Sequence, residues 1–91
     1  MHSIQTPAAF RRNAKKFFKI HPELKNRFRS IIEILRKHPT NPSLKLYSLS
    51  GKKKGLHAIS LTYEYRITLI IRFTEKAIIL VDIGSHDDVY R

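Results

Sequence analysis

The spacing of apolar residues changes once along this chain, at the turn-forming segment Pro39-Thr40-Asn41-Pro42. Before this segment, apolar residues recur every three to four positions, which places them along one stripe of a helix. After it, they alternate with polar residues, which is typical of strands that bury one face. The change predicts an α+β fold with two N-terminal helices packed on one face of a small antiparallel sheet.

Two helices are expected before the change. Thr6-Pro7 has the residue types that begin a helix, and an apolar stripe runs from Phe10 to Phe18. Pro22 ends this helix, because the residue before a proline avoids the helical conformation, and it begins a second stripe from Leu24 to Leu35. Residues 1–5 are expected to form a short first strand. The face opposite the first stripe is basic and carries Arg11, Arg12, Lys15, Lys16 and Lys19.

Four strands joined by short, antiparallel connections are expected after the change, at about Leu44–Leu49, Leu56–Leu61, Tyr65–Phe73 and Ala77–Ile83. A three-residue loop at 62–64 keeps like residues on the same face. It pairs Ile59 with Ile67 and Ser60 with Arg66. A three-residue loop at 74–76 likewise predicts the pairs Leu69 with Val81, Thr68 with Asp82, and Arg66 with Gly84. With these registers, the residues expected to converge on the sheet face away from the helices are Ser60, Arg66, Asp82 and His86.

The composition indicates a single domain, residues 1–91, with an anionic partner. The net charge is +11 in 91 residues, which suits nucleic acid, an anionic membrane surface or an acidic protein. The chain contains no cysteine, so it has neither a disulfide framework nor a thiolate metal site. It also lacks an apolar run of the length that a signal peptide or a membrane helix needs. A soluble, cytoplasmic protein is therefore expected.

The end of the chain carries two groups that can transfer protons. His86 and Tyr90 are four residues apart, directly after the last expected strand, so a helical turn would place them on the same side. RNA is cleaved without a metal when one group takes the 2′-hydroxyl proton, cations stabilise the phosphate and another group protonates the leaving oxygen. His86 is the expected acid or base, Arg66 the cation, and Tyr90 or Tyr47 a proton donor or a stacking partner for a base. This chemistry predicts no cofactor and no metal.

Other basic and polar residues are expected to contact RNA, and each also has a structural interpretation. The expected contacts are Lys52, Lys53, Lys54, Ser60 and Arg72. The three lysines lie between Gly51 and Gly55, where a solvated turn is equally plausible. Arg66 alternates with apolar neighbours, as in any half-exposed strand. His57 is expected to be structural and Glu64 to be a solvent-exposed loop residue.

Taken in order, four segments resemble the RelE/ParE superfamily of toxins from type II toxin–antitoxin systems, above all its YafQ-like branch. They are residues 44–51, 54–56, 65–67 and 82–90. The resemblance implies a toxin that cleaves mRNA, often on the ribosome, and an acidic antitoxin that inhibits it. His86 matches the catalytic His of the branch, Tyr90 its terminal aromatic, and Arg66 the strand Arg of RelE-like members. Residues 52–54 match positions where basic residues contact RNA.

The chain departs from the YafQ-like pattern at three places. Tyr47 and Ser60 stand where that branch often has His, and Glu64-Tyr65 replaces its Asp-Trp. An mRNA-cleaving toxin is the leading hypothesis. The alternatives are a ParE-like DNA gyrase inhibitor, which acts through protein contacts, and a basic RNA-binding module without activity.

Overall fold

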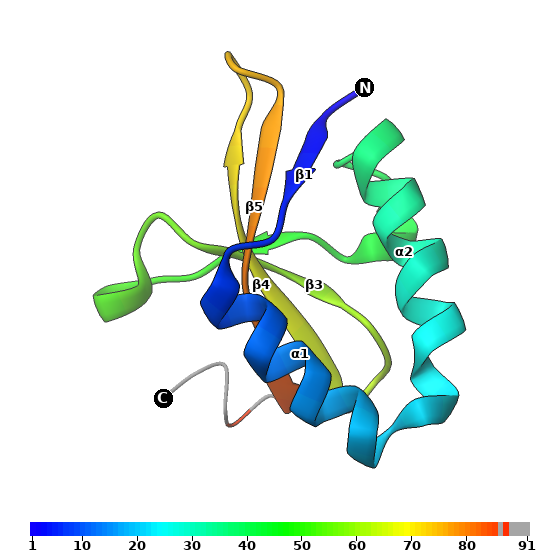
Figure 1. The fold of residues 1–91 in the computed structure, drawn as a ribbon. Helices are drawn as coiled ribbons and strands as arrows, with labels where there is room; N and C mark the ends of the chain where they lie inside the picture. Colours follow the sequence, from blue (N-terminus) through cyan, green and yellow to red (C-terminus); the bar gives the residue numbers. More distant parts are fainter. Residues whose placement is uncertain (86, 88–91) are drawn as a thin grey trace.

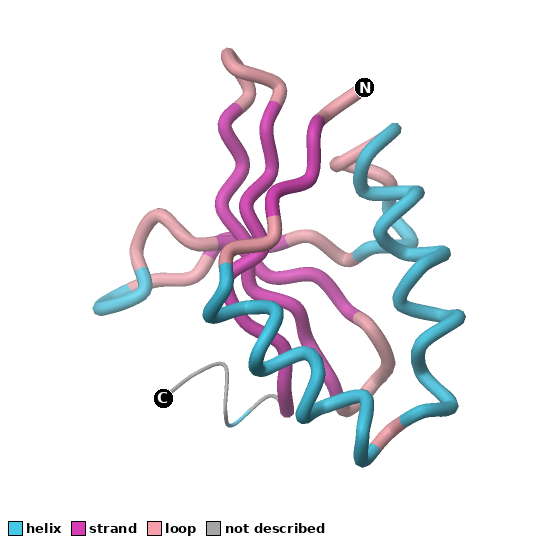
Figure 2. The backbone as a smooth tube through the Cα atoms, in the orientation of Figure 1, coloured by secondary structure: helices cyan, strands magenta, loops and turns pink. Residues whose placement is uncertain are grey.

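The computed structural model describes residues 1–85 and 87, and shows two helices on one face of a five-stranded sheet (Figures 1 and 2). The helices are α1 (Ala8–Ile20) and α2 (Lys25–Lys37), and short 3-10 turns lie at η1 (Pro22–Leu24), η2 (Pro42–Leu44) and η3 (Gly51–Lys53). The strands are β1 (Ser3–Gln5), β2 (Tyr47–Ser48), β3 (His57–Ser60), β4 (Tyr65–Arg72) and β5 (Ala77–Ser85). The order across the sheet is β1-β5-β4-β3-β2. The predicted α+β class is confirmed. Within the described residues, no helix is long and apolar enough to cross a membrane.

The two helices pack through aromatic side chains. Helix α1 buries Phe10, Phe17 and Phe18, as its apolar stripe predicts, and leaves its five basic residues exposed. The Phe28 ring of α2 lies 6.4 Å from that of Phe10 and 5.1 Å from that of Phe18, measured between centroids. The Nε of Arg27 donates a hydrogen bond to the Leu61 carbonyl, at the end of β3. These contacts fix α2 against both α1 and the sheet.

Strand β1 makes the sheet mixed, because it runs parallel to β5 while all the other pairs are antiparallel. Parallel strands cannot be joined by a tight turn and need a long crossover. Here the chain between the two strands contains both helices and the other three strands. The expectation of short antiparallel links therefore holds for β2 to β5 and does not extend to the first strand.

The first of the four expected strands is much shorter than the sequence suggests. The Asn41 side-chain oxygen accepts hydrogen bonds from the backbone N–H and the hydroxyl of Ser43, at 2.9 and 2.8 Å, and this begins the turn at Pro42–Leu44. Lys45 follows with a φ of 53°, a left-handed conformation that interrupts a strand. Only Tyr47–Ser48 then pairs with β3.

The registers around β4 match the prediction except near its second hairpin. Ile59 pairs with Ile67 and Ser60 with Arg66, as the three-residue loop predicts. The next loop has four residues, 73–76, because Arg72 pairs with Ala77, and Leu69 pairs with Leu80 instead of the expected Val81. A bulge at Val81 adds one residue to β5. The bulge offsets the longer loop, so Thr68 still faces Asp82 and Arg66 still faces Gly84, as predicted.

The sheet carries a large core on the helix side and a small apolar cluster on the other. The helix side buries the main core, which includes Ile59, Ile67 and Leu69. On the opposite side, Leu49 and Ala58 form a second cluster with the half-buried Tyr47 and Leu56. The face that was expected to bind RNA is thus partly apolar near β2.

Candidate nucleic-acid interface

Arg66 is the centre of the candidate site, in a row of paired residues across three strands. Ser60 of β3 and Gly84 of β5 flank it on either side. One terminal nitrogen of Arg66, Nη1, donates to the carbonyls of Thr62 at 2.6 Å and Tyr63 at 2.9 Å. The same nitrogen lies 3.4 Å from the Ser60 hydroxyl. The structure therefore brings Ser60 and Arg66 together, as the register predicts.

The bonds of Arg66 also hold the loop between β3 and β4. The Ser60 hydroxyl donates to the Thr62 carbonyl at 2.8 Å, and the Thr62 hydroxyl accepts from the N–H groups of Glu64 and Tyr65, both at 3.2 Å. Arg66 is half-buried. Its Nε and Nη2 make no hydrogen bond to a described residue.

A hollow of about 490 Å³ opens beside Arg66 and is lined by Tyr63, Glu64, Arg66, Ser85 and Asp87. Ser85 and Asp87 precede and follow His86 in the chain. His86 and Tyr90 lie outside the described residues, so the roles expected for them remain predictions. Among the described residues, no group of three His, Asp or Glu side chains could hold a metal ion.

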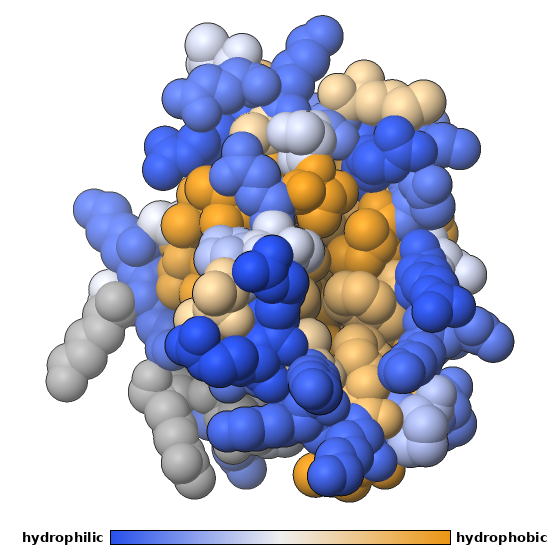
Figure 3. Space-filling model, in the orientation of Figure 1, coloured by the Kyte–Doolittle hydropathy of each residue, from blue (hydrophilic) through white to orange (hydrophobic). Residues whose placement is uncertain are grey.

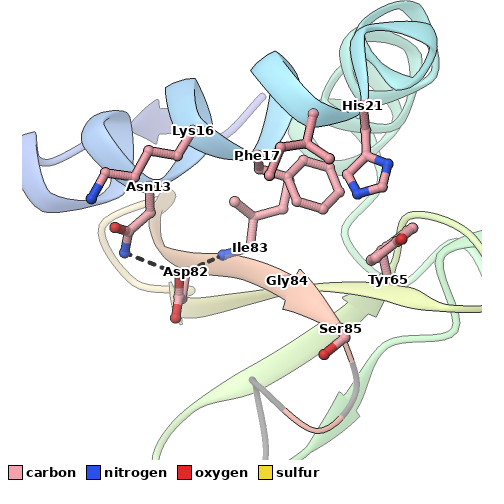
Figure 4. A pocket seen from close by; sticks show the side chains of 10 residues that line it. Asn13, Lys16, Phe17, His21, Tyr65, Asp82, Ile83, Gly84 and Ser85 are labelled. Carbon is pink, nitrogen blue, oxygen red and sulfur yellow. Dashed lines mark hydrogen bonds between the residues drawn. The ribbon is translucent and has the colours of Figure 1, made fainter.

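Asp82 does not join Ser60 and Arg66, contrary to expectation. Its carboxylate accepts from the Asn13 side chain of α1 at 3.2 Å and from the N–H of Ile83 at 2.8 Å (Figure 4). Strand β1 pairs only with residues 77–79 of β5, so no described strand lies beside the outer edge of β5 at Ile83. Asp82 satisfies the N–H at this edge, and this draws its side chain toward α1.

Asp82 instead lines a second hollow, of about 470 Å³, between α1 and the end of β5 (Figure 4). His21 is prominent there, with its ring centroid 4.8 Å from those of both Phe17 and Tyr65. This histidine was not among the predicted site residues, although its position four residues after Phe17 continues the apolar stripe of α1. Its imidazole therefore acts as a packing surface as well as a polar group.

The remaining predicted site residues lie far apart, on two strands and in one loop. Tyr47 of β2 pairs with Ala58, on the same face as Arg66 but two strands away. Lys53 and Lys54 belong to the loop around η3, whose turns use positive φ values at Gly51 and Gly55. Arg72 is exposed at the far end of β4. Six residues of strand separate it from Arg66, about 20 Å, so the two cannot contact the same phosphate.

A separate groove runs between the two helices. Its floor is apolar, and basic side chains stand along its rim, around a space of about 500 Å³. The floor is formed by Phe10, Ala14 and Phe18, and the rim by Arg11, Lys15, Lys19 and Lys25. Figure 3 shows hydrophobic surface between hydrophilic regions on the face that carries the two helices. Because α1 contains no acidic residue, no carboxylate of its own offsets this charge.

Comparison with known proteins identifies the fold. The chain matches no protein-family model and no curated protein sequence. A metal-bound toxin from Helicobacter pylori is 26% identical with a TM-score of 0.79, covering 98% of this chain and 99% of that one. YafQ from E. coli is 15% identical with a TM-score of 0.82, and both chains are covered fully.

Two further structures agree. The E. coli DinJ–YafQ toxin-antitoxin complex matches with a TM-score of 0.79 at 16% identity, covering 99% of this chain and 98% of that chain. A YoeB/ParE toxin from Agrobacterium tumefaciens matches with a TM-score of 0.74 at 13% identity, covering 92% and 98%. The chain therefore has the fold of YafQ and of the YoeB/ParE toxin.

Proposed function

We propose that this protein is the toxin of a type II toxin–antitoxin system and that it is an endoribonuclease acting on mRNA at the ribosome. The toxin assignment is supported by the likeness to YafQ, which extends over the whole chain. The observation that carries the nuclease proposal is the position of Arg66. It lies opposite Gly84 and shares a hollow with Ser85, the residue that leads into His86.

In the proposed reaction, the RNA supplies its own nucleophile. One side chain takes the proton of a 2′-hydroxyl, whose oxygen attacks the adjacent phosphorus, and another protonates the departing 5′-oxygen. The products are a 2′,3′-cyclic phosphate and a 5′-hydroxyl. His86 is the proposed acid or base; where it acts as the base, Tyr90 or Tyr47 donates the proton to the leaving oxygen. The Nε and Nη2 donors of Arg66 stabilise the charge that develops on the phosphate. This scheme needs no metal or cofactor.

The test is to incubate purified protein with a defined mRNA, with and without ribosomes, and to map the cut ends. We expect cleavage by the wild type, with the termini given above. His86→Gln should abolish it, because an amide cannot exchange a proton near neutral pH, while circular dichroism shows an unchanged fold. If the wild type cuts no RNA but causes gyrase-bound DNA breaks, the ParE-like alternative replaces this proposal. If it binds RNA without either activity, the binding-module alternative does.

The partner in this proposal is an acidic antitoxin that crosses the basic face of α1. The groove between α1 and α2 supports this, because an apolar floor with a rim of Arg11, Lys15, Lys19 and Lys25 complements an acidic amphipathic helix. Expression of the whole operon should yield a copurifying acidic polypeptide that suppresses toxicity. If no such polypeptide copurifies and the neighbouring gene has no effect on toxicity, the partner is wrong.

A further inference from the structure

Tyr63 is the most exposed large hydrophobic side chain in the described part of the molecule. Its relative exposure is 91%, at the tip of the short loop between β3 and β4. A single exposed apolar residue is ordinary on a protein surface and needs no explanation. The surroundings of Tyr63 give it significance, since they make its loop rigid and place it beside the candidate site.

Hydrogen bonds hold several backbone groups of the loop that carries Tyr63. The N–H groups of Leu61 and Thr62 both donate to the Tyr65 carbonyl, at 2.9 and 3.2 Å. Arg66 donates to the carbonyl of Tyr63 itself and to that of Thr62. A ring on such a loop is already positioned in the absence of a ligand, so binding costs little ordering of the backbone.

The hollow beside Tyr63 has the charge pattern of a nucleotide site. On one side, Arg66 contributes Nε and Nη2, which make no hydrogen bond to a described residue, and such a pair of donors suits a phosphate. Glu64 and Asp87 also line the hollow, and the carboxylate of the exposed Glu64 disfavours a second phosphate there. The rest of the hollow is bordered by the Tyr63 ring. It therefore suits a nucleotide base better than a second phosphate of the RNA backbone.

We infer that Tyr63 is a stacking platform for a base of single-stranded RNA, next to the phosphate that Arg66 contacts. This inference rests on the proposed action on RNA. It assigns a specific RNA contact that neither the composition nor the fold indicates by itself. Bases of single-stranded RNA stack readily on aromatic rings, and such a contact tolerates any sequence because every base has a π-face. Tyr63 is thus a binding residue, distinct from the groups that transfer protons.

The test uses the purified protein and a short single-stranded RNA with 2′-O-methyl groups, which cannot be cleaved by the proposed chemistry. Tyr63→Ala should weaken binding about five- to hundredfold, as expected for one lost base stack. Tyr63→Phe keeps the ring and should bind within about twofold of the wild type. The matched control is Phe73→Ala, because Phe73 is 60% exposed at the other hairpin tip of β4. It should leave binding unchanged.

Two further measurements separate stacking from charge. The dependence of affinity on salt should be the same for Tyr63→Ala and the wild type, since no phosphate contact is removed. Inorganic polyphosphate, a polyanion without bases, should bind both proteins equally. Equal RNA binding by Tyr63→Ala and wild type, or an equal loss with Phe73→Ala, overturns the inference.

The outcome also separates this inference from the proposed function. A wild type that cuts mRNA, together with a Tyr63→Ala variant that binds RNA normally, refutes the stacking role alone. A wild type that neither cuts nor binds RNA refutes both. Loss of antitoxin binding by Tyr63→Ala with unchanged RNA affinity would assign the ring to a protein interface instead.

Discussion

Replacing Arg66 tests two roles that the structure assigns to different atoms of one guanidinium. Nη1 donates two short hydrogen bonds to the carbonyls of the loop between β3 and β4, at 2.6 and 2.9 Å. A hydrogen bond from a charged donor contributes about 1.5–3 kcal/mol when buried. Arg66 is only half-buried, so solvent competes for both carbonyls. We therefore expect Arg66→Ala to lose about 1–2 kcal/mol of unfolding free energy, and Tm to fall by about 5–15 °C in a domain of this size.

The second role concerns cleavage. Nε and Nη2 are the proposed donors to the phosphate, and loss of one such electrostatic contact typically lowers the rate on the order of 10²–10³. Arg66→Lys keeps the charge but lacks the planar fork. This variant should lose much of the stabilisation that Arg66 gives the loop, but only part of the cleavage activity. Arg72→Ala is the stability control, because Arg72 lies on the same strand and face but makes no hydrogen bond to a described residue. Its Tm should stay within about 2–4 °C of the wild type, equivalent to about 0.5 kcal/mol.

Thermal unfolding followed by circular dichroism measures the first role, and mRNA cleavage well below the Tm of the variant measures the second. An Arg66→Ala protein with the Tm of the wild type would refute the loop anchor. One that is destabilised yet cuts at the full rate would refute the phosphate contact and leave Arg66 purely structural.

Three further outcomes are expected. Replacing Lys52, Lys53 and Lys54 together by Ala should weaken RNA or ribosome binding and flatten its salt dependence without changing the preferred cut sites; an unchanged slope, measured by fluorescence anisotropy, points to a solvated turn. Reversing the charge of the helix groove with a Lys15→Glu, Lys19→Glu double variant should slow antitoxin association at low salt far more than at high salt, measured by stopped flow. Asp82→Ala should cost about 0.5–1.5 kcal/mol in thermal melts, with Asn13→Ala adding less in that background than alone.

The fold was largely predictable because local patterns dominate it. The helical stripe and the alternating strands follow from side-chain periodicity, and the β3 to β4 register follows from keeping Ile59 opposite Ile67. The direction of β1 was not predictable in this way. Its pairing with β5 joins residues more than 70 positions apart, as in Ser3 with Ala77, so no local turn determines it.

The site was only partly predictable, for a similar reason. Ser60 and Arg66 meet because they are paired across a short hairpin. Asp82 is in its predicted register opposite Thr68, yet its side chain serves Asn13 and the edge of β5. The hydrogen-bond partners of Asp82 depend on where β1 ends and on where α1 crosses the sheet. Both are set by contacts between residues far apart in the sequence. Register predicts which backbones are neighbours, whereas the partner of an edge side chain depends on the whole fold.

The bulge at Val81 allows a sharp test of how β5 is built. Because Val81 is the extra residue between the pairs Leu69 with Leu80 and Thr68 with Asp82, deleting it keeps every observed pair on both sides. The protein should still fold, at a cost below about 3 kcal/mol. The matched control is deletion of Ile70 from β4, which is also half-buried but lies in an unbulged stretch.

The control deletion should be far more damaging. Without Ile70, the alternation of β4 is shifted by one residue on one side of the gap, so core residues are turned toward the opposite face. Thermal unfolding of the two deletion proteins shows whether Val81, unlike Ile70, can be removed without shifting the strand register. Bulges also redirect neighbouring side chains, so loss of Val81 should weaken the contact between Asp82 and Asn13. The Asp82→Ala substitution should then cost less in the deletion background than in the wild type. If the Val81 deletion unfolds the chain as fully as the Ile70 deletion does, the assigned bulge is wrong, and the agreement between the predicted and observed pairing of Arg66 with Gly84 has another cause.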